Sequence, residues 1–218
     1  MNSLILDCSA GMKIFVLKNE EIFSVVDDNQ KKHTDELLLS LHGLLEQAKL
    51  SVDDLDVIGV CVGPGSFTGI RVAVSIAKGL SVESKIKLVE MCNFDVYVSQ
   101  KIENSVLCLE GFSNNVYARI YVDGITKDVC LTVEELVEKI KNQQLDLVFV
   151  QNEKVQNMLK KYEIISQIAT FDAISCFKNK ISKNEFIEIN QIFPVYLRAS
   201  QAEIEREKKL KGIKGYGV

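Results

Sequence analysis

Short apolar segments and longer amphipathic ones follow one another in a regular order along the first part of this chain. Three strand-like segments come first, at Leu4–Asp7, Lys13–Leu17 and Ile22–Val26. Apolar residues then recur with helical spacing over Thr34–Lys49. A buried strand pattern at Val57–Val62 precedes a second helix, which runs from Phe67 to Ser81.

The second half mixes strands and helices less regularly. Thr132 and Glu135 have the spacing of a capping box, which predicts a helix from there to Lys141. Strands are predicted near Lys87–Met91, Val106–Leu109, Val116–Val122 and Leu145–Val150, and weaker helices near Val155–Tyr162 and Phe171–Lys178.

This order predicts an α/β protein with two lobes. Three strands, a helix, a strand and a helix form the order expected of one lobe of an actin-like ATPase or ribonuclease-H-like fold. We therefore assign residues 1–103 to an N-terminal lobe and residues 104–218 to a smaller C-terminal lobe. One option is that the last segment returns to the first lobe.

The second helix is apolar over an unusually wide arc. On a helical wheel its apolar residues cover roughly 220°, whereas a surface helix needs a stripe of only about 100°. Gly69, Ala73 and Ala77 recur every four residues. A row of small side chains lets another backbone come close. The helix therefore needs cover on two sides.

The first helix has a broad apolar face made of Leu37, Leu38, Leu41, Leu44, Leu45 and Ala48, with Leu39 and Gly43 on roughly the opposite side. Either the second lobe or a protein partner could cover the extra apolar surface of the two helices. We favour a partner. The contact residues that we assign to it are Leu39, Gly43, Gly69, Ala73, Ala77 and Leu80.

A glycine-rich motif joins the buried strand to the second helix. Three glycines and a proline predict a tight turn, in which we expect Gly65 to adopt positive φ. Ser66 is placed to cap the helix, whose free N–H groups would also suit an anion. The motif lacks the Gly-Lys pair of a phosphate loop. Its residues of interest are Gly63, Pro64, Gly65, Ser66, Phe67, Thr68, Gly69 and Arg71.

The motif from Gly63 to Arg71, continued by Ala77-Lys78-Gly79-Leu80, resembles the signature of the TsaB (YeaZ) family. Ile5-Leu6-Asp7-Cys8-Ser9 resembles the opening strand and turn of that family. Pro194-Val195-Tyr196-Leu197-Arg198 resembles its closing segment, and His33-Thr34 precedes the first long helix as it usually does there. One segment differs: the family usually reads Asp-Ala-Arg-x-Gly-Glu-Val-Tyr where this chain has Glu110–Tyr117.

The resemblance implies an actin-like fold and a role in making threonylcarbamoyladenosine at position thirty-seven of tRNA. It implies a non-catalytic subunit that supports a TsaD-like protein, which carries ATP or ADP and the metal, while this chain has no cofactor of its own. A TsaE-like ATPase would reset the complex. By resemblance, the chain pairs through its two long helices, with itself when alone, and meets tRNA only through the complex.

A rival hypothesis is a stand-alone enzyme of the same fold, either a nucleotide-binding ATPase or a peptidase. Asp7 ends the first strand where actin-like ATPases hold a metal-nucleotide, and Ser9 follows in the turn. The turn has a single glycine, so we interpret Asp7 and Ser9 as a turn cap or a vestigial nucleotide site. The only two histidines, His33 and His42, are spaced too far apart along a helix to share a metal. We therefore assign no catalytic and no metal-binding residue.

Composition adds few constraints. Hydrophobic residues make up 47% and charged residues 26%, as in ordinary globular proteins. The net charge of −4 disfavours a dedicated nucleic-acid binder, although the segment from Arg198 to Lys214 is locally basic. A hypothesis for that tail is contact with tRNA phosphates; the alternative is a solvated tail. Six scattered cysteines, no apolar run of membrane-spanning length and no leader pattern predict a cytoplasmic protein without membrane contact.

Overall fold

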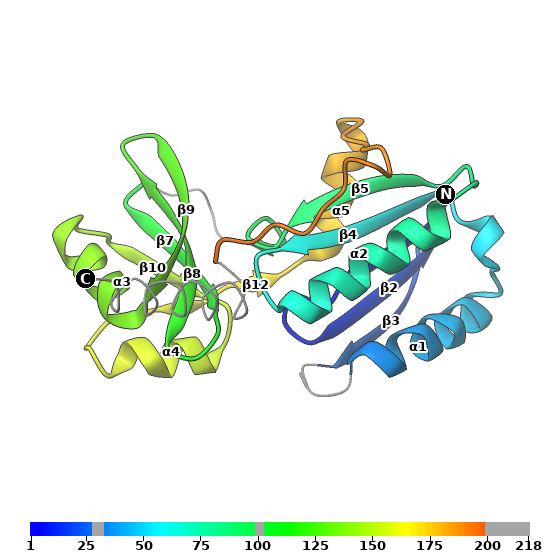
Figure 1. The fold of residues 1–218 in the computed structure, drawn as a ribbon. Helices are drawn as coiled ribbons and strands as arrows, with labels where there is room; N and C mark the ends of the chain where they lie inside the picture. The colour runs from blue at the N-terminus through cyan, green and yellow to red at the C-terminus, as the bar shows by residue number, and fades with distance from the viewer. Residues whose placement is uncertain (28–32, 99–102, 199–218) are drawn as a thin grey trace, which may run out of the picture.

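The chain folds into two lobes, each built on its own five-stranded sheet (Figure 1). The computed structural model describes residues 1–27, 33–98 and 103–198. The predicted α/β architecture with two lobes is confirmed. The basic tail from residue 199 onward lies outside the described residues, so the hypothesis about it stays a prediction.

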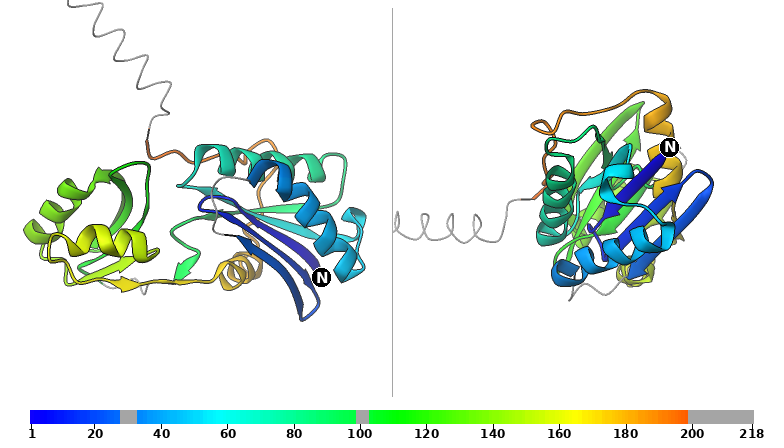
Figure 2. Two further views of the ribbon diagram at one scale, coloured as in Figure 1. Left: turned by 90° about the horizontal axis from the view of Figure 1, so that it is seen from below. Right: turned by 90° about the vertical axis from the view of Figure 1, so that its right-hand side faces the viewer.

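The sheet of the first lobe has the strand order β3-β2-β1-β4-β5. Strands β1 (Asn2–Asp7), β2 (Met12–Lys18) and β3 (Glu21–Asp27) are antiparallel neighbours, whereas β4 (Val57–Gly63) and β5 (Lys87–Cys92) run parallel to β1. Helices α1 (His33–Ala48) and α2 (Phe67–Ser81) cover one face of this sheet, with a short helix η1 (Val52–Asp54) after α1. Figure 2 shows α5 (Ala173–Ser182) on the opposite face.

Alternation along the strands explains why both faces need cover. Leu4 and Leu6 of β1 pack with α1 and α2, while Ile5 between them belongs to the core on the α5 side. Gly59 of β4 makes room for α5, because a Cβ there would lie 2.5 Å from the ring of Phe177. The central strands are therefore buried on both faces.

The sheet of the second lobe has the order β11-β10-β7-β8-β9. Its strands are β7 (Ser105–Glu110), β8 (Asn115–Val122), β9 (Ile125–Thr132), β10 (Leu147–Val150) and β11 (Gln167–Ile168). Helices α3 (Val133–Asn142) and α4 (Glu153–Lys160) pack on one face. The predicted capping box is present, since the side chain of Thr132 accepts from the N–H of Glu135 and that of Glu135 from the N–H of Thr132.

The chain enters the second lobe near residue 104 and returns to the first lobe with α5, so a single boundary at residue 104 does not divide the two lobes. Strands β6 (Tyr97–Val98) and β12 (Thr170–Phe171) form a small sheet between the lobes, and α5 follows on the first lobe. Ile192 is fully buried in the core under α1 and α2, and the N–H of Val195 donates to the carbonyl of Val62 at 2.7 Å. We call residues 192–198 the strap. The second lobe therefore occupies the middle of the chain, and residues 173–198 pack with the first.

Candidate functional site

The glycine motif is a docking turn within the first lobe. The N–H of Ser66 donates to the carbonyl of Ser9 at 2.7 Å, and the side chain of Ser66 caps α2 by accepting from the N–H of Gly69. The peptide bond between Gly63 and Pro64 is cis, and the carbonyl of Pro64 accepts from the side chain of Asn93. The motif therefore fastens β4 and α2 to the turn between β1 and β2.

The positive φ lies at Gly63 (+116°), so our expectation for Gly65 was wrong. A Cβ at Gly63 would also lie 2.6 Å from the carbonyl oxygen of Val195 in the strap. Gly65 is needed for a different reason: a Cβ there would lie 2.5 Å from the carbonyl oxygen of Ser9. Sequence shows that glycines occupy a turn, but it does not distinguish a special dihedral angle from a close approach.

Asp7 and Ser9 bond to one another. Asp7 is buried, and its Oδ1 accepts from the backbone N–H of Ser9 at 2.9 Å and from its hydroxyl at 2.5 Å. This is an Asx-type turn, the geometry expected of a turn cap. Within the part of the chain that the structure describes, no group of three or more His, Cys, Asp or Glu side chains could hold a metal ion.

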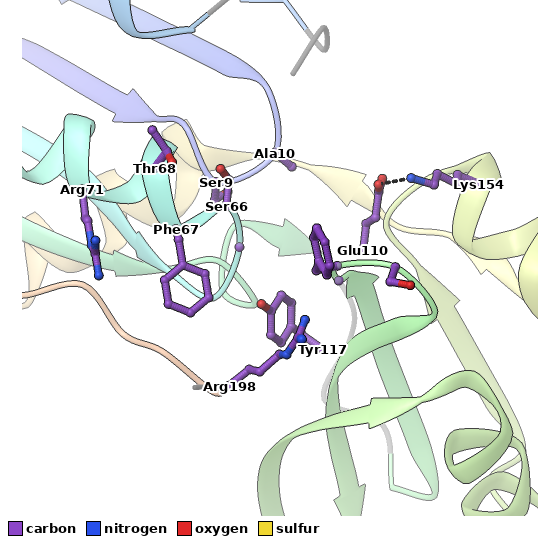
Figure 3. A pocket seen from close by; sticks show the side chains of 14 residues that line it. Ser9, Ala10, Ser66, Phe67, Thr68, Arg71, Glu110, Tyr117, Lys154 and Arg198 are labelled. Atoms are coloured by element: carbon purple, nitrogen blue, oxygen red, sulfur yellow. Dashed lines mark hydrogen bonds and ion pairs between the residues drawn. The ribbon is translucent and has the colours of Figure 1, made fainter. Parts of the chain in front are cut away.

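A cavity of about 590 Å³ separates the glycine motif from the second lobe (Figure 3). Its walls come from the turn after β1, the start of α2, the turn after β7, and the end of the strap. The lining residues are Ser9, Ala10, Gly65, Ser66, Phe67, Thr68, Arg71, Glu110, Gly111, Phe112, Ser113, Tyr117, Lys154 and Arg198. We call this cavity the interlobe cavity. The site residues Ser9, Gly65–Thr68 and Arg71 meet here, whereas Asp7 lies outside its lining.

Of the charged side chains that line the interlobe cavity, Glu110, Lys154 and Arg71 have polar partners within the chain. Glu110 forms an ion pair with Lys154 and also accepts from the side chain of Asn152, so its charge is neutralised. Arg71 donates from Nε to the hydroxyl of Tyr196 at 2.7 Å, and the Tyr196 ring stacks on Phe67 with centroids 4.5 Å apart.

Sequence reasoning missed Tyr117, Lys154 and Arg198 as cavity residues, because they come from distant elements that only the fold brings together.

The row of small residues on α2 does not face a partner. Ala73 and Ala77 are fully buried in the core of the first lobe, and a Cβ at Gly69 would lie 1.9 Å from the carbonyl oxygen of Cys8. Our assignment of these three residues to a partner interface was therefore wrong. The backbone that comes close to Gly69 is that of the turn after β1, in the same chain.

The remaining interface residues lie nearer the surface. The side chain of Leu39 is 73% exposed, Gly43 is half-buried, and Leu80 is half-buried against the core. Leu38, which the wheel places on the inner face of α1, is 56% exposed. Gly79, which the prediction omitted, is also exposed. We call Leu38, Leu39, Gly43 and Gly79 the outer helix surface.

Comparison with known proteins shows the family to which the chain belongs. A family model described as "TsaD: tRNA N6-adenosine threonylcarbamoyltransferase" matches residues 24–146, more than half of the 218 residues. A relative from Buchnera aphidicola (subspecies Acyrthosiphon pisum), named "tRNA threonylcarbamoyladenosine biosynthesis protein TsaB", is 27% identical over 74% of this chain and 70% of its own. The chain belongs to this family, as a member of the TsaB/YeaZ type.

Other members of the TsaB/YeaZ family are similar to this chain over most of its length. A TsaB protein of Bacillus subtilis is 22% identical over 82% of this chain and 86% of its own. Two solved structures from Pseudomonas aeruginosa have the same fold: one is titled as similar to peptidase YEAZ (TM-score 0.69, 19% identity) and one as YeaZ (0.66, 18%). They cover 90% and 89% of this chain and 99% and 100% of their own. The predicted actin-like fold is therefore confirmed.

Proposed function

We propose that this chain is the TsaB-type subunit that binds and supports a TsaD-like protein in forming threonylcarbamoyladenosine at position thirty-seven of tRNA. The relatives named for the biosynthesis of this nucleoside support the pathway. None of these comparisons favours the stand-alone ATPase or peptidase. No described helix is long and apolar enough to cross a membrane.

The observation that supports the partner role is a pair of helical glycines that the packing of this chain does not require. Gly43 of α1 and Gly79 of α2 each have nothing within 4 Å of an added Cβ. Glycine inside a helix costs about 0.5–1 kcal/mol relative to alanine. Because the chain itself does not need glycine at either position, a close external backbone explains their presence.

The exposed leucines on α1 complete the outer helix surface. Leu38 and Leu39 are exposed next to Gly43, although each fully buried leucine side chain contributes about 1.5–3 kcal/mol. Both helices lie on the same side of the sheet in the first lobe, as Figure 1 shows. Two helices from each protein would then form a four-helix contact. A second copy of the chain would occupy the same surface when the partner is absent.

In this proposal the chemistry belongs to the partner. The TsaD-like subunit carries ATP or ADP and the metal, a TsaE-like ATPase resets the complex, and tRNA reaches this chain only through the assembly. The chain has no catalytic residue and no cofactor of its own, and it acts in the cytoplasm. Each of these assignments rests on family membership and on the outer helix surface.

The decisive experiment is co-expression with the TsaD-like protein of the same organism, followed by mass spectrometry of modified adenosine in tRNA from cells depleted of this chain. We expect wild type to restore the modified nucleoside and to co-purify with the partner. Leu39→Glu should weaken partner binding about tenfold or more, because it places a charge in an apolar contact. Ile125→Glu is the matched control, since Ile125 is similarly exposed but lies on β9 of the second lobe.

Normal modification by folded Leu39→Glu, together with unchanged partner binding, would remove the outer helix surface from the proposal. Hydrolysis of ATP by the purified chain alone would instead support the stand-alone enzyme.

A further inference from the structure

Strand β3 forms an edge of the sheet in the first lobe, at the lower margin of that sheet in Figure 1. Its seven residues stay in register with β2 without a bulge, from Glu21 opposite Lys18 to Asp27 opposite Met12. Within the described residues, no strand pairs with the other side of β3. Only alternate residues of an antiparallel pair exchange backbone hydrogen bonds, so the N–H and C=O groups of the others point outward. The outer side of β3 is therefore a regular row of backbone donors and acceptors.

The other edges of the two five-stranded sheets are protected against the addition of a strand. Ile187 forms an antiparallel bridge with Leu88 on the outer side of β5. Strand β11 has only two residues, and β9 carries Lys127 and Asp128 along its length. Short strands, cover and charged side chains are common ways of blocking a sheet edge. Within the described residues β3 has none of them, because between its terminal acidic residues it reads Ile-Phe-Ser-Val-Val.

Two apolar side chains of β3 remain in contact with solvent. Ile22 is 52% exposed and Val26 is 55% exposed. Both lie on the face of the sheet away from α1, because Phe23 and Val25 alternate with them and pack on the core that α1 covers. A strand added to this edge would cover both exposed side chains and pair with the backbone of β3 at the same time. The backbone and the side chains therefore suit the same kind of occupant, an extended segment.

Acidic side chains lie at both ends of this edge. Glu20 and Glu21 are exposed at its start and form no ion pair within the described residues, and Asp27 ends the strand. A second copy of β3, paired antiparallel about Ser24, would place Glu21 opposite Asp27 at both ends of the contact. Like charges directly opposite one another are destabilising, whereas opposite charges are favourable. The charges therefore favour a segment with basic ends over a second copy of this strand.

We propose that β3 binds an extended segment of a partner protein by strand addition. The segment carries apolar side chains beside Ile22 and Val26, and Lys or Arg opposite Glu21 and Asp27. Hydrogen bonds between the two main chains supply the affinity, and the side chains supply the selectivity. The contact is made by β3, whereas the outer helix surface belongs to α1 and α2, so this partner segment is additional to the contact with a TsaD-like protein.

The test is fluorescence anisotropy of a labelled, end-capped peptide, Lys-Val-Thr-Val-Thr-Val-Lys, titrated with the purified full chain. We expect saturable binding below millimolar concentration. A peptide with Glu at both ends should bind about fivefold more weakly, because like charges then lie opposite one another. A peptide with Pro at its centre should bind about tenfold more weakly, because Pro lacks the N–H that the ladder needs. Amide hydrogen exchange of residues 21–27 should slow when the first peptide binds, since outward N–H groups become hydrogen-bonded.

Variants of the full chain locate the contact. Ile22→Lys and Val26→Lys should each weaken binding of the first peptide about tenfold, because each removes an apolar contact and places a like charge on the edge. Ile125→Lys is the matched control, since Ile125 is 66% exposed on the edge strand β9. Glu21→Lys should abolish the preference for Lys over Glu at the ends of the peptide. Circular dichroism confirms that each variant is folded.

Three results would overturn the inference. They are failure of the first peptide to bind at millimolar concentration, equal affinity for the peptide with Pro, and unchanged affinity in both Ile22→Lys and Val26→Lys. Self-association that both variants abolish in light scattering would assign the edge to a second copy instead. Competition by a synthetic peptide of residues 199–218 would assign it to the tail of this chain. The titration uses the chain alone, so its outcome is independent of whether the outer helix surface binds a TsaD-like protein.

Discussion

Gly69 and Gly79 lie on the same helix, α2, but their surroundings are opposite. At Gly69 an added Cβ would lie 1.9 Å from the carbonyl oxygen of Cys8, so the fold of this chain requires glycine there. At Gly79 an added Cβ would meet nothing within 4 Å. The comparison separates glycines that serve the internal packing of α2 from glycines that are free to serve a contact with another molecule.

Gly69→Ala should give the largest effect. The added methyl group would overlap a backbone carbonyl, so either α2 or the turn after β1 must shift. We expect a loss of more than about 3 kcal/mol in the free energy of unfolding, or failure to accumulate in soluble form. Urea unfolding followed by circular dichroism measures it. A variant as stable as wild type would show that the turn moves freely, and the distinction between the two glycines would fail.

Gly65→Val extends the same argument to the glycine motif. Its side chain would meet the carbonyl oxygen and Cβ of Ser9 at 2.5 and 2.7 Å. A loss of about 2–3 kcal/mol is expected from overpacking, without any need for positive φ. Thermal melting of the purified variant is the measurement. A loss of tRNA modification at an unchanged melting temperature would indicate a direct functional contact of this turn.

Ala77→Leu tests the inner face at a position that is not glycine. Ala77 is fully buried between α2 and the sheet, so the larger side chain should cost about 1–3 kcal/mol in unfolding free energy. Association with a partner should change only as far as folding does. If the variant keeps its stability but loses self-association in light scattering, the original assignment of the small-residue row to an interface is restored.

Gly79→Ala should give the smallest change in stability and the opposite sign. Because the added methyl group meets nothing in the chain, the higher helix propensity of alanine should stabilise the fold by about 0.5–1 kcal/mol. Self-association or partner binding should weaken, and a larger side chain, as in Gly79→Leu, should weaken it further. Gly43→Ala is the parallel test on α1. Stabilisation without any loss of association would leave both glycines unexplained.

Periodicity predicted most elements but not what covers them. The strands and α-helices from Leu4 to Ser81 were predicted in the correct order with small errors at their ends, whereas the short helix η1 was not predicted. The wheel of α2 showed correctly that Gly69, Ala73 and Ala77 share a face. It could not show whether that face meets a partner or the sheet of the same lobe, because a spacing in sequence contains no information about the neighbour.

One edge strand and three very short strands were missed for a related reason. Strand β9 is an edge strand whose residues are exposed or half-buried, so it lacks the clear alternation that β8 has. Strands β6, β11 and β12 have two residues each, too few to produce a pattern. The interlobe cavity could be predicted only in part: the glycine motif marks one wall, whereas Tyr117 and Arg198 reach it through long-range topology.

The return of residues 173–198 to the first lobe has a consequence for biosynthesis. A ribosome delivers the strands β1 to β5 and the helices α1 and α2 well before it delivers Phe177 and Ile192, which complete the cores of the same lobe, and Val195, which bonds to β4. Domains generally fold as units during synthesis. The second lobe, whose elements are contiguous in sequence, can therefore finish folding on the nascent chain before the first lobe does.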